Sequence, residues 1–202
     1  MSDASALDRV WTVPNMLSAA RLGLAIVLFI AIEQEWYRGA LALFLVAAST
    51  DWVDGWWARR FHQVSRLGRI FDPLVDKVII CGGYVLLAAA PETSIAAWMA
   101  VVVVVRELVV TAVRAEMERA GHDFSAALSG KLKMVLQCAA LALELAARAW
   151  PEWEPAAILP AFGGLRQLAT VVSWAAVIAT VWSGLEYLVA ARGLLTGSRP
   201  AA

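Results

Sequence analysis

Four aspartates fall within residues 51–76 of a chain that is otherwise rich in apolar side chains. Asp51 and Asp54 are three residues apart, and Asp72 and Asp76 are four apart, so each pair lies on one face of a helix. The two predicted helices are antiparallel and joined by a short connection, which lets the four carboxylates converge on one point. Such a set of oxygen ligands favours hard divalent cations, namely Mg²⁺, Mn²⁺ or Ca²⁺.

Residues between the two acidic pairs suit a ligand that contains phosphate. Gly55 permits close approach to the helix backbone, Ala58 keeps the same face shallow, and Arg59 can bind a phosphate through its forked guanidinium. Two metal ions with a diphosphate between them are the chemistry that this geometry suits. The alternative is a solvated loop between charged helix ends, which the energetic cost of acids at membrane depth disfavours.

The elements that must position these aspartates are strongly apolar. Of the 202 residues, 61% are hydrophobic and 17% are charged, against about 45–50% and about 25% in a typical soluble domain. Six stretches are long enough to cross a bilayer as helices: 16–33, 38–57, 71–90, 94–114, 130–149 and 167–191. We therefore expect residues 1–202 to form one all-α integral membrane domain with six transmembrane helices and a polar cavity facing the cytoplasm.

The positions of the positive charges predict the orientation of this domain. All but three of the 17 Lys and Arg residues lie at the chain ends, in the second and fourth connections, or in the adjoining half-helices; the exceptions are Arg38, Arg148 and Arg166. Because positive residues are enriched on the cytoplasmic side, we expect both termini and the aspartates to be cytoplasmic. A short amphipathic helix over Ala4–Thr12 is expected to lie on the inner leaflet. The net charge of zero gives no general attraction to nucleic acid.

The pattern D-x2-D-G-x2-A-R-x8-G-x3-D-x3-D over residues 51–76 resembles the signature of the CDP-alcohol phosphotransferases. All eight fixed positions are present: Asp51, Asp54, Gly55, Ala58, Arg59, Gly68, Asp72 and Asp76. The resemblance implies a six-helix membrane fold, usually dimeric. It also implies an activity in which a pair of divalent metal ions binds the diphosphate of a CDP-linked donor, and an alcohol attacks the phosphorus with release of CMP.

The resemblance implies roles for individual residues as well. The ligands of two Mg²⁺ or Mn²⁺ ions would be Asp51, Asp54, Asp72 and Asp76. Asp76 would also accept the proton of the attacking alcohol. The contacts to the donor would come from Asn15, Gly55, Ala58, Arg59, Ser65 and Gly68.

Other segments resemble one subfamily, the bacterial phosphatidylglycerophosphate synthases. These segments are residues 13–21, 105–114, 129–137 and 182–193. The resemblance implies CDP-diacylglycerol as the donor, sn-glycerol 3-phosphate as the acceptor, and a homodimer in the bacterial inner membrane. One departure is Met134, where the subfamily usually has Thr.

Four cations are candidates for binding the acceptor's own phosphate: Arg106, Arg114, Lys131 and Lys133. They are too many for a neutral alcohol, whereas a dianionic phosphate needs two or three such donors. The alternative is that they only reflect cytoplasmic topology. For Arg106, a buried ion pair with Glu107 is an equally good interpretation.

Other functions remain open at the level of sequence. Inositol phosphate is an alternative acceptor, as is phosphatidylglycerol, which would give cardiolipin. A different class of protein, a cation transporter that uses the four aspartates, would place the acids near the middle of the membrane. Glu144 and Glu186 are acids in apolar stretches for which the sequence indicates no partner.

Overall fold

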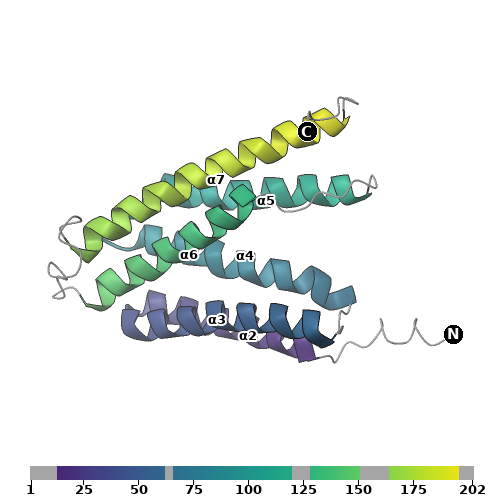
Figure 1. The fold of residues 1–202 in the computed structure, drawn as a ribbon. Helices are drawn as coiled ribbons and strands as arrows, with labels where there is room; N and C mark the ends of the chain where they lie inside the picture. The colour runs from purple at the N-terminus through teal and green to yellow at the C-terminus, as the bar shows by residue number, and fades with distance from the viewer. Residues whose placement is uncertain (1–12, 62–65, 120–127, 151–163, 196–202) are drawn as a thin grey trace.

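A computed structural model describes residues 13–61, 66–119, 128–150 and 164–195. Within these residues the chain forms six α-helices and no strand (Figure 1). They are α2 (Val13–Glu33), α3 (Tyr37–Phe61), α4 (Arg66–Ala89), α5 (Ala97–Arg119), α6 (Leu128–Ala149) and α7 (Leu165–Leu195). Each helix overlaps most or all of one of the six predicted stretches, so the all-α fold class is confirmed for the described residues. The predicted helix over Ala4–Thr12 lies outside the described residues.

Several helices continue beyond the apolar stretches that predicted them. α3 reaches Phe61 and α5 reaches Arg119, each about one turn further than expected. The added residues include Arg and Glu, which have good helix propensity, so the helix persists where the apolar pattern stops. α5 instead begins late, at Ala97, after a turn in which Glu92 has a positive φ of 51°.

One helix of the described residues is by itself long and apolar enough to cross a membrane, over Leu165–Gly193 of α7. Charged residues interrupt the other long helices. Large apolar side chains are nevertheless exposed on the outer surfaces of several helices, for example Ile30 of α2, Leu108 of α5 and Val189 of α7. Apolar surface of this extent is expected where a protein contacts lipid or another chain. Six membrane crossings remain a prediction.

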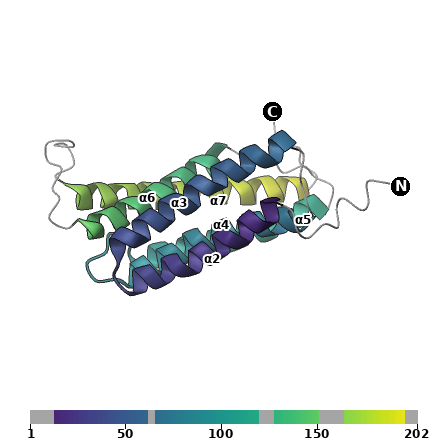
Figure 2. The ribbon, with the colours of Figure 1, turned by 90° about the horizontal axis from the view of Figure 1, so that it is seen from below.

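The helices form a bundle in which α4 and α6 are the most central (Figure 2). α2 contacts both α3 and α4, whereas α6 contacts α3, α4 and α7, and α5 contacts α4 and α7. The core between them is apolar and includes the buried side chains of Leu28, Tyr84, Leu87 and Leu141. This arrangement leaves α3 and α4, the two helices of the acidic signature, both packed on α2.

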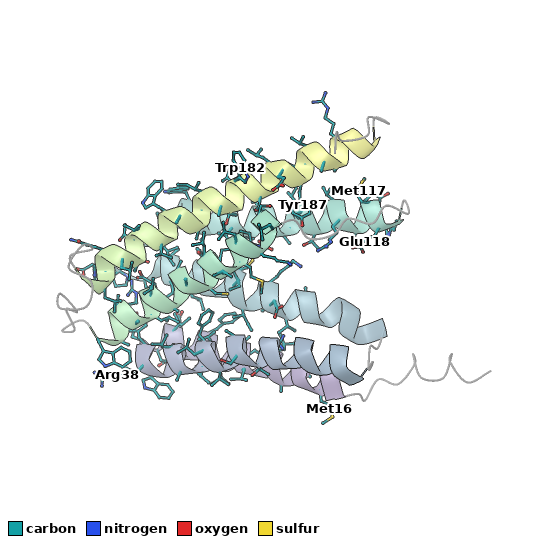
Figure 3. The ribbon with its side chains drawn as sticks, in the orientation of Figure 1. Met16, Arg38, Met117, Glu118, Trp182 and Tyr187 are labelled. Atoms are coloured by element: carbon teal, nitrogen blue, oxygen red, sulfur yellow. The ribbon has the colours of Figure 1, made fainter. Side chains whose placement is uncertain are left out.

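The three arginines that were exceptions to the charge distribution lie together at one end of the bundle, here called the Arg148 end. Each donates a hydrogen bond to a backbone carbonyl: Arg38 Nε to Ala149 O at 3.0 Å, Arg148 Nη2 to Pro91 O at 2.7 Å, and Arg166 Nη1 to Glu92 O at 2.9 Å. Arg38 is labelled at this end in Figure 3, whereas Glu118 lies toward the opposite end. The shared location agrees with the predicted separation of charges between the two ends.

Glu144 of α6 has partners that the sequence did not indicate. Its Oε1 accepts a hydrogen bond from Arg148 Nε at 2.9 Å, and its Oε2 accepts hydrogen bonds from the backbone and hydroxyl of Ser94. Arg148 Nη1 also lies 3.4 Å from the Tyr37 hydroxyl. We call these residues, with Pro91, the Glu144 cluster. Because it joins α3, α6 and the segment between α4 and α5, it braces the Arg148 end. Glu186, by contrast, is exposed on α7.

Candidate active site

The residues of the acidic signature lie on two helices. Asp51, Asp54, Gly55, Ala58 and Arg59 are in the C-terminal half of α3, and Gly68, Asp72 and Asp76 are in the N-terminal half of α4. Both halves point toward the end of the bundle where α2 begins and α7 ends, here called the signature end (Figure 1). Asn15 is at the start of α2 at this same end, and Ser65 lies outside the described residues.

Asp76 is the member of the signature whose side chain the structure describes. Asp51, Asp54 and Asp72 have described backbones only, so the convergence of the four carboxylates remains a prediction. No group of three His, Cys, Asp or Glu side chains capable of holding a metal occurs among the side chains that are described. The Asp76 carboxylate is one quarter exposed, and its oxygens are donors that a hard divalent ion prefers.

Arg21 of α2 binds Asp76 from 55 residues away in the sequence. Its Nη1 donates to Asp76 Oδ1 at 3.0 Å, and the Arg21 side chain is only 1% exposed. A guanidinium this deeply buried needs a carboxylate partner, because an unpaired charge would cost several kcal/mol, on the order of 3–5. The contact ties α2 to the signature helix α4 and fixes the orientation of the Asp76 carboxylate.

A cavity of about 60 Å³ lies beside Asp76, between α3, α4 and α6. Its walls are formed by Phe44, Ala47, Ala48, Asp76, Ile79, Ile80, Met134 and Cys138. Asp76 is the only charged residue among them. A cavity with an apolar lining next to a carboxylate can accept an apolar group of a ligand whose polar part is bound by the acid.

A second set of charges lies among α5, α6 and α7, here called the Glu107 cluster: Arg106, Glu107, Lys133 and Ser183. Glu107 Oε1 accepts hydrogen bonds from Lys133 Nζ and from Arg106 Nη1, the latter at 3.3 Å. Arg106 Nη2 donates to Ser183 Oγ at 3.0 Å. The side chains of Arg106, Glu107 and Lys133 are all at least nine-tenths buried. The buried ion pair considered for Arg106 therefore exists, and Lys133 shares its acid.

The other two candidate cations have different surroundings. Arg114 forms an ion pair with Glu118 at 3.4 Å, one turn further along α5, and its side chain is more than one third exposed. Lys131 is exposed on α6. The structure thus brings Arg106 and Lys133 together through Glu107, while Arg114 and Lys131 are nearer to solvent.

Lys77 follows Asp76 on α4, and its positive charge lies near enough to that of Lys133 for the two to repel each other. The Glu107 cluster is therefore close to the helix that carries Asp72 and Asp76. Three cations and one acid give this region an excess of positive charge, which suits an anion.

Sequence reasoning missed two contributors to this site. Arg21 belongs to the segment 13–21 that carried a family resemblance, yet no role followed from it. A signal was available, because a single arginine inside an apolar helix needs a buried partner. Lys77 was counted only as a topological charge, and its position next to Asp76 was the corresponding signal.

The residues of the acidic signature thus lie on α3 and α4, and a largely apolar cavity adjoins the last aspartate. A family model described as CDP-alcohol phosphatidyltransferase matches residues 11–182, and the chain belongs to this family. It is therefore an enzyme of the phosphatidyltransferase class, and the resemblance seen in residues 51–76 is confirmed.

Several curated relatives align with nearly the whole chain. The CDP-diacylglycerol–glycerol-3-phosphate 3-phosphatidyltransferase of Escherichia coli strain K12 is 34% identical over 187 residues, which cover 90% of this chain and 96% of the relative. Proteins with the same name from Shigella sonnei strain Ss046 and Shigella flexneri serotype 5b strain 8401 match with the same identity and coverage. The similarity extends well beyond the acidic signature.

Proposed function

We propose that this enzyme transfers the phosphatidyl group of CDP-diacylglycerol to sn-glycerol 3-phosphate, giving phosphatidylglycerophosphate and CMP. The observation that carries the proposal is the 34% identity to the E. coli enzyme of that name over 90% of this chain. Family membership supports this chemistry over the cation transporter considered from sequence. The buried cations of the Glu107 cluster favour an acceptor that carries its own phosphate.

Asp76 is proposed to act as the base. The acceptor hydroxyl oxygen forms a bond to the phosphatidyl phosphorus while its proton passes to the Asp76 carboxylate. The bond from this phosphorus to the bridging oxygen of the diphosphate breaks, and CMP leaves with the bonding electron pair. The bond from Arg21 holds the carboxylate in one orientation during this transfer.

Four carboxylates are proposed to hold two divalent metal ions, Mg²⁺ or Mn²⁺: Asp51, Asp54, Asp72 and Asp76. An all-oxygen donor set of this kind fits such ions, and Asp76 has the partial exposure that a ligand needs. When bound, the ions would neutralise the diphosphate and stabilise the charge on the departing CMP. The contacts to the rest of the donor are proposed for Asn15, Gly55, Ala58, Arg59, Ser65 and Gly68.

The cavity beside Asp76 supports a lipid donor. Phe44, Ile79 and Ile80 give it an apolar wall directly next to the proposed base. The diacylglycerol group that is esterified to the reacting phosphate would meet this wall. A soluble CDP-alcohol has no apolar tail for it, so the cavity favours CDP-diacylglycerol.

The acceptor phosphate is proposed to bind Arg106 and Lys133, with Arg114 and Lys131 at the more exposed side of the same site. Charge-assisted hydrogen bonds from two or more of these groups would be needed to hold a dianion. Lys77 of α4 adds a positive charge that repels Lys133, and an anion near both would relieve this repulsion, which supports a position of this phosphate near α4. The acceptor hydroxyl could then reach Asp76 on the same helix.

We further propose that all six helices cross the bacterial inner membrane, with both termini and the active site on the cytoplasmic side. Exposed apolar side chains on several helices support burial in lipid. The three arginines at the Arg148 end, opposite the signature end, support the orientation, because the remaining cations would then be cytoplasmic. A homodimer is proposed from the family resemblance.

The decisive experiment uses purified protein, CDP-diacylglycerol, Mg²⁺ and a panel of acceptors. We expect CMP release with sn-glycerol 3-phosphate and very little with glycerol, inositol, inositol phosphate or phosphatidylglycerol. Excess chelator should abolish turnover, and Mg²⁺ or Mn²⁺ should restore it. Faster turnover with another acceptor would overturn the acceptor assignment, and activity in excess chelator would overturn the metal assignment.

A further inference from the structure

Arg106 is held from one side by residues of α7 that the sequence had singled out without a role. Ser183 accepts a hydrogen bond from Arg106 Nη2 at 3.0 Å, and the Tyr187 ring centroid lies 5.6 Å from Arg106 Cζ. A Cβ built on Gly184 would lie 3.2 Å from Arg106 Cγ. The segment Ser183–Gly184–x2–Tyr187 thus contacts the arginine along its stem and at its guanidinium.

Tyr187 also touches the start of α6. A Cβ on Gly130 would lie 3.6 Å from the Tyr187 hydroxyl oxygen, and the Tyr187 side chain is buried. Gly130 and Lys133 are on the same segment of α6, while Arg106 and Glu107 are on α5. Three segments that separately resembled one subfamily therefore meet around Tyr187 (Figure 3, where Tyr187 is labelled).

One nitrogen of Arg106 has no partner among the described residues. Its Nη1 donates to Glu107 and its Nη2 to Ser183, but Nε is buried and forms no hydrogen bond there. Buried polar groups are nearly always hydrogen-bonded, so a buried donor left open in this way indicates a missing acceptor. A phosphate oxygen is an acceptor of the right charge for a guanidinium.

We propose that Ser183, Gly184 and Tyr187 of α7 are positioning residues that hold Arg106 so that its open Nε donates to the acceptor's phosphate. This inference rests on the proposed function and specifies how its acceptor site is built. The Tyr187 ring supports the guanidinium face, Ser183 fixes one of its nitrogens, and Gly184 leaves room for the stem. None of the three side chains needs to touch the substrate.

The role of the Tyr187 ring can be tested with two substitutions. Tyr187→Phe keeps the aromatic face and should leave the KM for sn-glycerol 3-phosphate close to that of the unmodified enzyme. Tyr187→Leu removes the face and should raise this KM by about 2- to 30-fold, the range that a lost cation–π contact gives. The KM for CDP-diacylglycerol should stay unchanged in both. A Leu variant with an unchanged acceptor KM would overturn the inference.

The role of Gly184 has a matched control. A Cβ on Gly184 would meet Arg106 Cγ at 3.2 Å, and a Cβ on Gly83 would meet Leu141 Cδ1 at 3.2 Å in the apolar core. The two Gly→Ala substitutions therefore add the same atom at the same closeness. Gly184→Ala should raise the acceptor KM several-fold by displacing Arg106, while Gly83→Ala should not. If Tyr187→Leu does not fold, this pair decides the question.

Failure of the inference is distinguishable from failure of the proposed function. If the unmodified enzyme does not use sn-glycerol 3-phosphate, the function itself is wrong. The second case is an unmodified enzyme that does use sn-glycerol 3-phosphate, with the same acceptor KM in Tyr187→Leu, Gly184→Ala and Gly83→Ala. The α7 residues would then only contribute to packing, and the proposed function would stand. A rise in acceptor KM at constant donor KM is a readout that a purely structural role would not produce.

Discussion

Among the described residues, the Glu144 cluster and the Glu107 cluster are both buried charge networks, and they are built differently. In the Glu144 cluster one acid meets one arginine, and every polar atom of the pair has a partner. Glu144 accepts through both oxygens, and the three guanidinium nitrogens of Arg148 donate to Glu144, the Tyr37 hydroxyl and the Pro91 carbonyl. The net charge of the Glu144–Arg148 pair is zero, and the hydrogen-bonding groups of both side chains are satisfied.

The Glu107 cluster has one acid for two cations. Its net charge is positive, and Arg106 Nε is buried without a partner among the described residues. A neutral network in which every polar atom has a partner can hold helices together. A network with one more cation than acids has a positive charge that can bind an anion. The comparison therefore separates a brace at the Arg148 end from the proposed acceptor site toward the signature end.

The largest expected effect is on the signature side. Asp76→Asn should lower kcat by about 10²–10⁴-fold, because the amide cannot take the proton of the acceptor hydroxyl. The Asn oxygen can still accept the hydrogen bond of Arg21, but the buried charge of Arg21 then lacks a compensating carboxylate, so the free energy of unfolding should fall as well and kcat is compared per folded molecule. A variant with near-normal kcat and only a raised KM for CDP-diacylglycerol would show that Asp76 binds the donor but is not the base.

A substitution at the Arg148 end should affect stability and leave activity unchanged. Arg148→Met leaves Glu144 buried with an uncompensated charge, which should lower the free energy of unfolding by about 3–5 kcal/mol. Turnover per folded molecule should be unchanged, since this cluster is remote from the signature end. Unfolding curves and CMP release, measured on the same preparation, provide the check. A reduced kcat of the folded Arg148→Met protein would show that the Glu144 cluster also affects catalysis, which would contradict its purely structural role.

Lys133→Met tests whether the Glu107 cluster binds the acceptor. Losing a charge-assisted contact of about 1.5–3 kcal/mol should raise the KM for sn-glycerol 3-phosphate by roughly 10- to 150-fold. Lys131→Met should raise it by less, because its side chain is exposed. Arg119→Met is the control with no expected change, as this exposed side chain pairs with Glu116 at 3.8 Å. If Lys133→Met and Arg119→Met had the same KM for sn-glycerol 3-phosphate, the Glu107 cluster would not bind the acceptor. Its positive charges would then reflect only the cytoplasmic location of the signature end.

The smallest expected effect is a change in inhibition by inorganic phosphate when the acid of each cluster, Glu107 or Glu144, is replaced. Glu107→Gln keeps a hydrogen-bond acceptor but raises the positive charge of its cluster, so inorganic phosphate should inhibit several-fold more strongly. Glu144→Gln at the Arg148 end should leave phosphate inhibition unchanged. The check is the inhibition constant of inorganic phosphate for each variant, measured in the same assay. An equal change in both constants would contradict the proposed difference between the two clusters.

The fold followed from sequence because apolar stretches of membrane length leave few alternatives to helices. Helix ends were less accurate, since α3 and α5 continue through charged residues that are good helix formers. The acidic signature could be found because its spacing is local. Such spacing places each acidic pair on one helical face without any knowledge of tertiary structure.

The partners of buried charges could not be predicted in the same way. Arg21 and Asp76 are 55 residues apart, and Lys133 and Glu107 are 26 apart. Which cation meets which acid depends on how α2, α4, α5 and α6 pack, and no local pattern encodes it. For Glu144 no partner was predicted, although Arg148 is four residues later on the same helix, and this spacing was a signal that the sequence analysis did not use.

The bonds at the Arg148 end are directed at the backbone, and this affects how the sequence can vary. Arg38, Arg148 and Arg166 each donate to a main-chain carbonyl, at Ala149, Pro91 and Glu92. Every amino acid supplies that oxygen. The residues that follow α4 and end α6 can therefore be exchanged over generations without loss of these bonds, provided the chain keeps its path, whereas each arginine has no substitute of equal reach and geometry. The three donor positions should therefore tolerate substitution least, whereas the acceptor positions are limited by other features, namely the burial of Ala149 and the positive φ of Glu92.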